Sequence, residues 1–272
     1  KRMTTSIKSS AFYSTYNKMF ETVIADTDEL REEAHRLRYK VFCTENEGYE
    51  DPKAHPNGME MDRFDDTAEH ALLMYKPLNI AIGTVRVIGP NENNLQDSFP
   101  LQNLCGAYAL HDETLVKNSC EFSRLCISKE ARGAVKEHLA EQKSLTIGRR
   151  DNCFSIHEKP LLNIALSAAP LGLVKGAFEI MMQNQFLNGF GIMEEVHLGK
   201  LVNAGLVYEQ IGPVMDYHGK RLPFSFNILE IFDHAINHNP EVWSIRTEKG
   251  DTNAQARNCL LYTSPSPRDG LL

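Results

Sequence analysis

The chain has 272 residues, of which 42% are apolar and 24% charged, and its formal net charge is −7 at pH 7. A chain of this length can bury a substantial core in one large or two small domains. The acidic balance gives no support to nucleic-acid binding as a main role, and no apolar run approaches the ~20 residues that span a bilayer.

The first predicted helix covers residues 28–42, because apolar residues recur there at helical spacing. Asp26 and Glu29 have the spacing of a capping box at its start. A loop rich in Gly, Pro, Asn and acidic residues follows, at residues 45–66. Residues 70–75 and 80–88 are β-rich and predict a strand pair joined by a turn.

A third strand is expected at residues 120–128. The next segment, residues 129–159, is polar and charged, so we interpret it as an insertion and a candidate mobile lid. The longest apolar segment, residues 161–187, predicts a helix that is interrupted at Pro170 and stopped by Asn188-Gly189.

A shorter helix is predicted at residues 195–203, followed by strands at residues 206–211, 214–217 and 221–226. Asn227, with Glu230 three residues later, predicts the cap of a last amphipathic helix. A helix, an antiparallel strand pair and then alternating helices and strands predict an α+β fold with a central mixed sheet. Neither Gly-x-Gly-x-x-Gly nor a Walker loop occurs in the sequence, so nucleotide-driven chemistry has little support.

Six cysteines include no Cys-x-x-Cys pair, and no His/Cys cluster has zinc spacing. We therefore expect no metal site, and reduced thiols in a cytoplasmic protein. The first residues are not followed by an apolar segment typical of a secretion signal. The chain begins with Lys1 rather than a methionine. It is therefore expected to be a fragment, or Met3 is its true start.

We expect residues 1–24 to be an extension, residues 25–245 to form the domain, and residues 251–272 to lie outside the fold. The sequence from Cys259 onward resembles translated adapter sequence; an ordinary disordered tail of Ser and Pro is the alternative.

Charged residues occur in places where a plain core would not hold them. Arg38 lies off the apolar stripe of its helix, and a solvated face is the alternative interpretation. Arg86 shares one face of its strand with Ile82 and other apolar or small residues. It is therefore either near the strand end or paired with a buried carboxylate, for which Asp62 and Asp65 are candidates.

The stretch Glu121-Phe122-Ser123-Arg124 is the sharpest candidate site. A regular pleat points Glu121 and Arg124 to opposite faces, whereas a β-bulge near Ser123 brings them to the same side and releases a backbone N–H. That N–H can stabilise the oxyanion of acyl transfer, and Glu121 can take a proton from the attacking amine. A structural Glu–Arg salt bridge is the alternative.

Together, Arg38-Tyr39-Lys40-Val41-Phe42, Asp62-x-x-Asp65, Gly83-Thr84-Val85-Arg86 and Glu121-Phe122-Ser123-Arg124 resemble the pattern of acyl-homoserine lactone synthases. The chain is more similar still to PEP-CTERM (exosortase) associated acyltransferases and to N-acyl amino acid synthases. Those groups share three further stretches with it: Cys43-Thr44-Glu45, Phe99-Pro100-Leu101, and residues 211–219 followed by Arg221 and Pro223. The resemblance covers roughly residues 25 to 230.

This resemblance implies a GNAT (acyl-CoA N-acyltransferase) fold that receives an acyl thioester on a phosphopantetheine arm. It implies catalytic roles for Glu121, Ser123 and Arg124. It also implies a fatty acyl donor on acyl carrier protein, a small amine acceptor, namely an amino acid, and no permanently bound cofactor, with acyl-CoA as the other donor. The substrate-binding residues that it implies are Arg38, Phe42, Asp62, Asp65 and Arg86.

Two departures bear on this interpretation. Lactone synthases have a tryptophan shortly after the position of Phe42, where this chain has Asn46-Glu47-Gly48. Acetyl-CoA enzymes of the superfamily have a Gly-rich loop for pyrophosphate after the central strand, and residues 129–133 offer one glycine. The first departure favours a product other than a lactone, and the second favours a carrier-protein donor over coenzyme A. The alternatives are a lactone synthase using S-adenosylmethionine, a CoA-dependent acetyltransferase, and a non-catalytic acyl-binding protein of an exosortase-type system.

Overall fold

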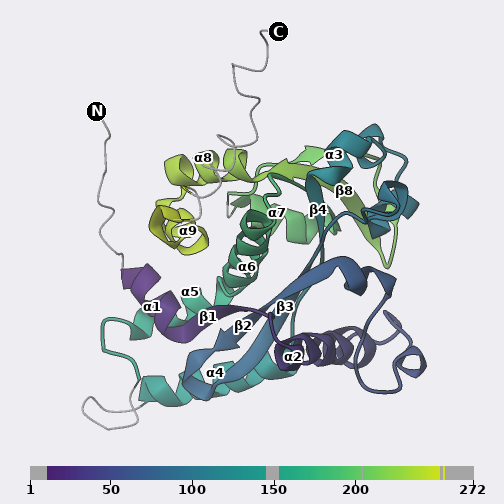
Figure 1. Cartoon of the computed structure of the whole chain (residues 1–272). Coiled ribbons are helices and arrows are strands. Elements are labelled where there is room, and N and C mark those ends of the chain that lie inside the picture. Colours follow the sequence, from purple (N-terminus) through teal and green to yellow (C-terminus); the bar gives the residue numbers. More distant parts are fainter. Residues whose placement is uncertain (1–10, 145–152, 204, 252–253, 255–272) are drawn as a thin grey trace, which may run out of the picture. The chain divides into compact units, whose positions relative to one another are not determined.

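The computed structural model describes residues 11–144, 153–203, 205–251 and 254 (Figure 1). The chain forms two compact units, each built from two separate stretches of sequence. The first unit contains residues 1–86 and 123–177, and the second contains residues 87–122 and 178–272. The units are described separately below.

The first unit holds four strands of the sheet and the helices that cover them. Within it the strand order is β1-β2-β3-β4. Its elements are α1 (Ala11–Met19), β1 (Phe20–Ile24), α2 (Asp28–Tyr39), β2 (Ala68–Tyr75), β3 (Ile80–Ile88), the second half of β4 (Ser119–Ile127), α4 (Lys129–Ser144), α5 (Leu162–Ser167) and the first half of α6 (Pro170–Gln183).

The N-terminal part of the chain belongs to this unit, which corrects the prediction of an extension over residues 1–24. Strand β1 pairs with β2 in antiparallel fashion, with Phe20 opposite Tyr75. Met19 and Phe20 are buried, and the hydroxyl of Tyr16 donates a hydrogen bond to the carbonyl of Ala169 at 3.1 Å. These apolar contacts and this pairing make residues 11–24 part of the fold.

Helix α2 packs on one face of the sheet in this unit. Ala34 and Leu37 form an apolar cluster with Leu72 of β2, as the periodicity predicts. The helix begins at Asp28, as predicted, but its cap is Thr27 rather than Asp26, because the side chain of Thr27 accepts from the N–H of Leu30. It continues as a π-helix over Lys40–Glu45.

Helices α4 and α6 cover the other face of β2. An added Cβ on Gly172 would lie 2.5 Å from the side chain of Leu73, so glycine permits the close approach of α6. The hydroxyl of Tyr75 lies 2.8 Å from Nδ1 of His138 on α4, whose Val135 and Leu139 are buried. Residues 129–144 are thus a packed helix, which corrects the predicted insertion; residues 145–152 lie outside the described residues.

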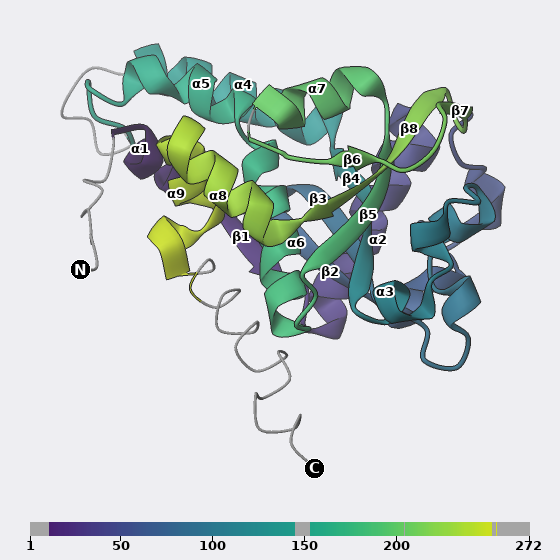
Figure 2. The same cartoon turned by 90° about the horizontal axis from the view of Figure 1, so that it is seen from above.

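The second unit contains the first half of β4, which pairs in parallel with β5, and β8, which pairs antiparallel with β5, β6 and β7 (Figure 2). The mixed sheet of the predicted α+β fold is confirmed. The elements of this unit are α3 (Glu113–Lys117), β5 (Asn188–Met193), α7 (Glu195–Asn203), β6 (Glu209–Gln210), β7 (Met215–Asp216), β8 (Lys220–Asn227), α8 (Ile228–His238) and α9 (Pro240–Arg246).

Strand β5 begins at Asn188-Gly189, which the sequence predicted as a helix stop. Gly189 pairs with Phe226 and Gly191 with Phe224 on β8. An added Cβ would lie 2.3 Å from the Phe226 ring at Gly189 and 2.8 Å from the Phe224 ring at Gly191. The glycines are there because aromatic rings lie over them.

Candidate active site

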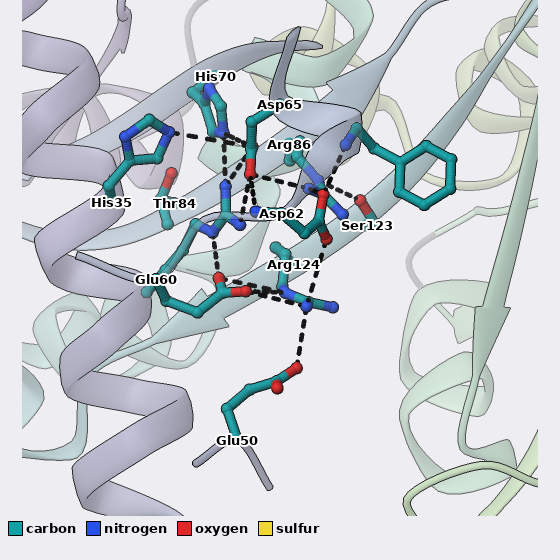
Figure 3. Close-up of polar contacts among 12 residues, drawn as sticks. His35, Glu50, Glu60, Asp62, Asp65, His70, Thr84, Arg86, Ser123 and Arg124 are labelled. Carbon is teal, nitrogen blue, oxygen red and sulfur yellow. Dashed lines mark hydrogen bonds and ion pairs between the residues drawn. The ribbon is translucent and has the colours of Figure 1, made fainter. Parts of the chain in front are cut away.

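Charged side chains of the first unit gather into one buried network, which we call the arginine network (Figure 3). Its members come from α2, the loop before β2, and strands β2, β3 and β4. They are Arg38, Glu50, Glu60, Asp62, Asp65, His70, Arg86, Ser123 and Arg124.

Arg38 is fully buried, so the alternative of a solvated helix face is wrong. Its Nε donates to Glu60 at 2.5 Å, and its two terminal nitrogens donate to the two carboxylate oxygens of Asp65 at 2.6 and 3.1 Å. The second pairing is bidentate, the geometry that a planar guanidinium favours. Nη1 also lies 2.9 Å from Nε2 of His70.

Arg86 is also fully buried, and its predicted pairing with Asp62 and Asp65 is confirmed. Its Nη1 lies 2.7 Å from Asp62 and 3.2 Å from Asp65. Its Nε donates to the hydroxyl of Ser123 at 2.9 Å. Asp65 therefore lies between two guanidinium groups, which bind α2 and β3 to the same loop.

The two aspartates are oriented by a short 3-10 helix, Arg63–Thr67. Asp62 accepts from the backbone N–H of Phe64 at 2.9 Å, while its own N–H donates to Asp65 at 2.7 Å. This reciprocal capping box fixes both carboxylates in one local turn, which explains their spacing of three residues.

Arg124 marks a break in the pleat of β4. Its φ of +50° is left-handed, which is rare for a residue with a Cβ. Consecutive residues of a regular strand point to opposite faces, yet both Ser123 and Arg124 contact the arginine network. The break predicted near Ser123 is therefore present, in the conformation typical of a β-bulge.

The guanidinium of Arg124 completes the network. It lies 3.0 Å from Glu60 and 3.0 Å from Glu50, and over the ring of Phe42 at 5.5 Å. Phe42 lies on the π-helix and is buried against Val41 and against Cys126 of β4. A π-helical turn is frequent at functional sites, and here it places an aromatic face beneath Arg124.

The charges of the network lower the pKa of two of its carboxyl groups, those of Glu60 and Asp65. Burial by itself would raise the pKa of Glu60, but the guanidinium groups of Arg38 and Arg124 outweigh burial and lower that pKa to about 2. The pKa of Asp65 lies far below its usual range, because hydrogen bonds from His70 and Arg38 outweigh its burial. Burial lowers the pKa of His35, beside the network, to about 4, so this histidine is neutral at pH 7.

Sequence reasoning missed Glu50, Glu60 and His70. The signal for Glu60 was its alternation with Asp62 in the loop, which places two carboxylates two residues apart. His35, Asp65 and His70 also bring potential metal ligands within 4.8 Å of one another. Nε2 of His70, however, faces the positive guanidinium of Arg38, and Asp65 is shared by two arginines, so this group is poorly suited to a cation.

Glu121 lies in the second unit, on the first half of β4, and it is buried. Its carboxylate accepts from the backbone N–H of Leu101 at 2.9 Å. This bond joins two stretches that carried the resemblance, Phe99-Pro100-Leu101 and Glu121-Phe122-Ser123-Arg124. Phe99 packs against Phe190 of β5, with ring centroids 5.8 Å apart.

The N-terminus of α4 is occupied by a carboxylate of the same chain. Glu45 accepts from the hydroxyl of Ser128 at 2.6 Å and from the backbone N–H groups of Lys129 and Glu130 at 2.7 and 3.1 Å. The N-terminal N–H groups of a helix are a general binding site for phosphate and other anions. Here Glu45 already uses them.

Residues 37–140 match the sequence profile of the acetyltransferase (GNAT) domain. This match indicates an enzyme that transfers acyl groups. No sequence among curated proteins matches the chain.

In the described residues no single helix is long and apolar enough to cross a membrane. Among these residues, one bent pair of helices, Lys159–Ser167 and Pro170–Gln183, reaches that length and apolar character when the two are taken together.

Solved structures share the fold. The CoA-dependent acyl-homoserine lactone synthase BjaI with MTA is 15% identical, with 89% of this chain and 99% of that chain covered and a TM-score of 0.50. TofI with an inhibitor and MTA is also 15% identical, with 82% and 99% covered and a TM-score of 0.50. FeeM, an N-acyl amino acid synthase from uncultured soil microbes, is 11% identical, with 80% and 98% covered and a TM-score of 0.44. The expected GNAT fold is confirmed.

Proposed function

We propose that the protein is an N-acyltransferase that moves a fatty acyl group from acyl carrier protein to the amine of an amino acid. One observation carries the proposal: the arginine network, from Arg38 to Arg124, lies wholly within the segment that matches the acetyltransferase domain. Burying so many charges is costly for a fold, and such clusters concentrate at functional sites.

The partly exposed edge of the network suits a zwitterionic acceptor. The side chains of Asp62, Glu50 and Arg124 are 30%, 26% and 12% exposed. The two carboxylates can bind an ammonium group, and the guanidinium can bind a carboxylate. An amino acid carries both charges one carbon apart, which supports it as the acceptor class.

In the proposed reaction, the free amine attacks the carbonyl carbon of the thioester. The C–N bond forms, the C–S bond breaks, and the thiol leaves with a proton. Glu121 acts as the base that takes a proton from the acceptor ammonium. The proposed donor to the oxyanion of the tetrahedral intermediate is a backbone N–H at the break beside Ser123.

The donor is proposed from the N-terminus of α4. Coenzyme A carries a pyrophosphate, a group that helix N-termini often bind. In this chain the carboxylate of Glu45 holds the first N–H groups of α4, and its negative charge would repel a phosphate. The phosphopantetheine arm of a carrier protein has no adenosine pyrophosphate, so this arrangement supports a carrier-protein donor.

The reaction is tested by mass spectrometry of lipid extracts from a host that expresses the protein. We expect long-chain N-acyl amino acids, reduced about 10²- to 10⁴-fold by Glu121→Gln because the base is lost. Glu113→Gln, an exposed carboxylate of the same unit, is the matched control and should leave the yield unchanged. Extracts without such products would contradict the function, and equal yields from Glu121→Gln would contradict the base.

The donor is tested with purified protein, by comparing acyl carrier protein and coenzyme A thioesters of the same chain length. The wild type should prefer the carrier-protein thioester, whereas Glu45→Ala should gain use of acyl-CoA. Glu47→Ala removes an exposed carboxylate two residues further along the chain and should not gain use of acyl-CoA. Equal use of both thioesters by the wild type would contradict the donor assignment.

A further inference from the structure

Arg246, at the end of α9 in the second unit, is a buried arginine that has no counter-charge within the part of the chain that the structure describes. Only 1% of its surface is exposed, and its Nε and Nη1 have no hydrogen-bond partner among the described residues. None of the ion pairs among the described residues involves its guanidinium. Cζ of Arg246 lies 5.9 Å from the centroid of the Phe178 ring.

An uncompensated guanidinium is among the most costly groups to bury. Burial lowers the pKa of Arg246 to about 10, so the group stays charged at pH 7. The Phe178 ring offers a cation–π contact, which does not satisfy N–H donors. The hydroxyls of Ser244 and Thr247, its neighbours on the helix, donate to backbone carbonyls of Pro240 and Trp243.

A second unsatisfied donor lies on the same helix. The indole N–H of Trp243 is buried and has no hydrogen-bond partner in the described ranges of the chain. Residues 243 and 246 are three apart, so their side chains share one face of α9. An indole and a guanidinium are donors only. This face therefore presents buried N–H groups that lack an acceptor.

The surroundings are apolar and aromatic. The ring of Phe178 contacts those of Phe122, Phe226 and Phe232, with centroids 6.1, 6.5 and 5.5 Å away. An acceptor at this place would be shielded from water, which strengthens its attraction to the guanidinium. The same surroundings disfavour an ion that carries more charge than Arg246 can balance.

We propose that Arg246 and Trp243 bind a monocarboxylate attached to an apolar chain. One guanidinium balances one negative charge, and its planar fork matches the two oxygens of a carboxylate. The aromatic neighbours suit an alkyl chain. This binding site lies in the second unit, outside the arginine network, and it does not rest on the proposed acyl transfer.

The first test measures melting temperature with octanoate as the probe. Octanoate should raise the Tm of the wild type and leave that of Arg246→Met unchanged. Without octanoate, Arg246→Met should melt at the wild-type temperature or about 2–4 °C above it, because an unpaired buried charge has been removed. Arg36→Met, at an exposed arginine of α2, should behave as the wild type in both conditions.

The second test uses fluorescence, because Trp243 is the single tryptophan of the chain. Octanoate should change this fluorescence in the wild type, and Arg246→Lys, which keeps the charge but loses the fork, should weaken octanoate binding about tenfold or more. Octylamine and inorganic phosphate should have no effect. Equal octanoate responses in the wild type and Arg246→Met, a response to phosphate alone, or no octanoate response in the wild type would overturn the proposal.

Discussion

Replacing Glu60 by glutamine tests the electrostatics of the arginine network directly. The side chain keeps its shape but loses the charge that lies between Arg38 and Arg124. Glu60 is 1% exposed, so solvent cannot replace the missing charge. The two guanidinium groups keep their other partners, Asp65 and Glu50.

The pKa of Glu60 gives the expected magnitude. Each pKa unit corresponds to about 1.4 kcal/mol, so a carboxyl held at about 2 instead of 4.5 contributes roughly 3 kcal/mol to the free energy of unfolding. Removing one partner of a buried ion pair costs a similar amount. We expect Glu60→Gln to lower the free energy of unfolding by about 2–4 kcal/mol at neutral pH.

The dependence on pH has a defined sign. Because the folded-state pKa is depressed, the contribution of Glu60 is complete above about pH 4.5 and is lost as the pH falls toward 2. Urea unfolding followed by circular dichroism should show the gap between wild type and Glu60→Gln narrowing below about pH 4.5. Glu32→Gln, on the exposed side of α2, should cost less than about 0.5 kcal/mol. A gap that stays constant across this range would refute the reasoning.

Two further predictions concern the fold. Gly189→Ala places a methyl group against the Phe226 ring and should lower the free energy of unfolding by about 1–3 kcal/mol. Gly199→Ala, on the open surface of a helix, should be neutral or stabilising. Chemical denaturation of both variants checks the difference. Removal of residues 1–24 deletes β1 and the buried Phe20, so we expect loss of soluble folded protein, measured by expression yield and circular dichroism, while Tyr16→Phe should cost about 1 kcal/mol. Soluble, cooperatively unfolding protein after the truncation would contradict the correction made for this segment.

The parts of the fold that the sequence predicted well are those in which one pattern dominates. Strand β3 was predicted at its observed bounds, because its residues other than Arg86 are β-favouring or small and lie between clear turn signals. The cap of α8 by Asn227 follows from local hydrogen bonding alone. Neither depends on distant residues.

Other elements depend on distant partners and could not be predicted. Gly189 has the sequence signature of a helix stop, and only the ring of Phe226, on another strand, makes it a strand residue. Strand β1 is five residues long and its role becomes visible only through its pairing with β2. In the network, Arg86 could be predicted because it shares one face of its strand with apolar residues. Glu60 could not, because its place in the network depends on the path of a loop.

The arginine network links segments that are far apart along the chain, and this bears on how the first unit folds. Arg38 meets Glu60 and Asp65 across 22 and 27 residues, and Arg86 meets Ser123 across 37. A partly assembled intermediate would bury some of these charges before their partners arrive, at a high cost. The network should therefore make α2, the loop before β2, and β4 form together. We expect few stable intermediates and slow folding, because long loops must close first.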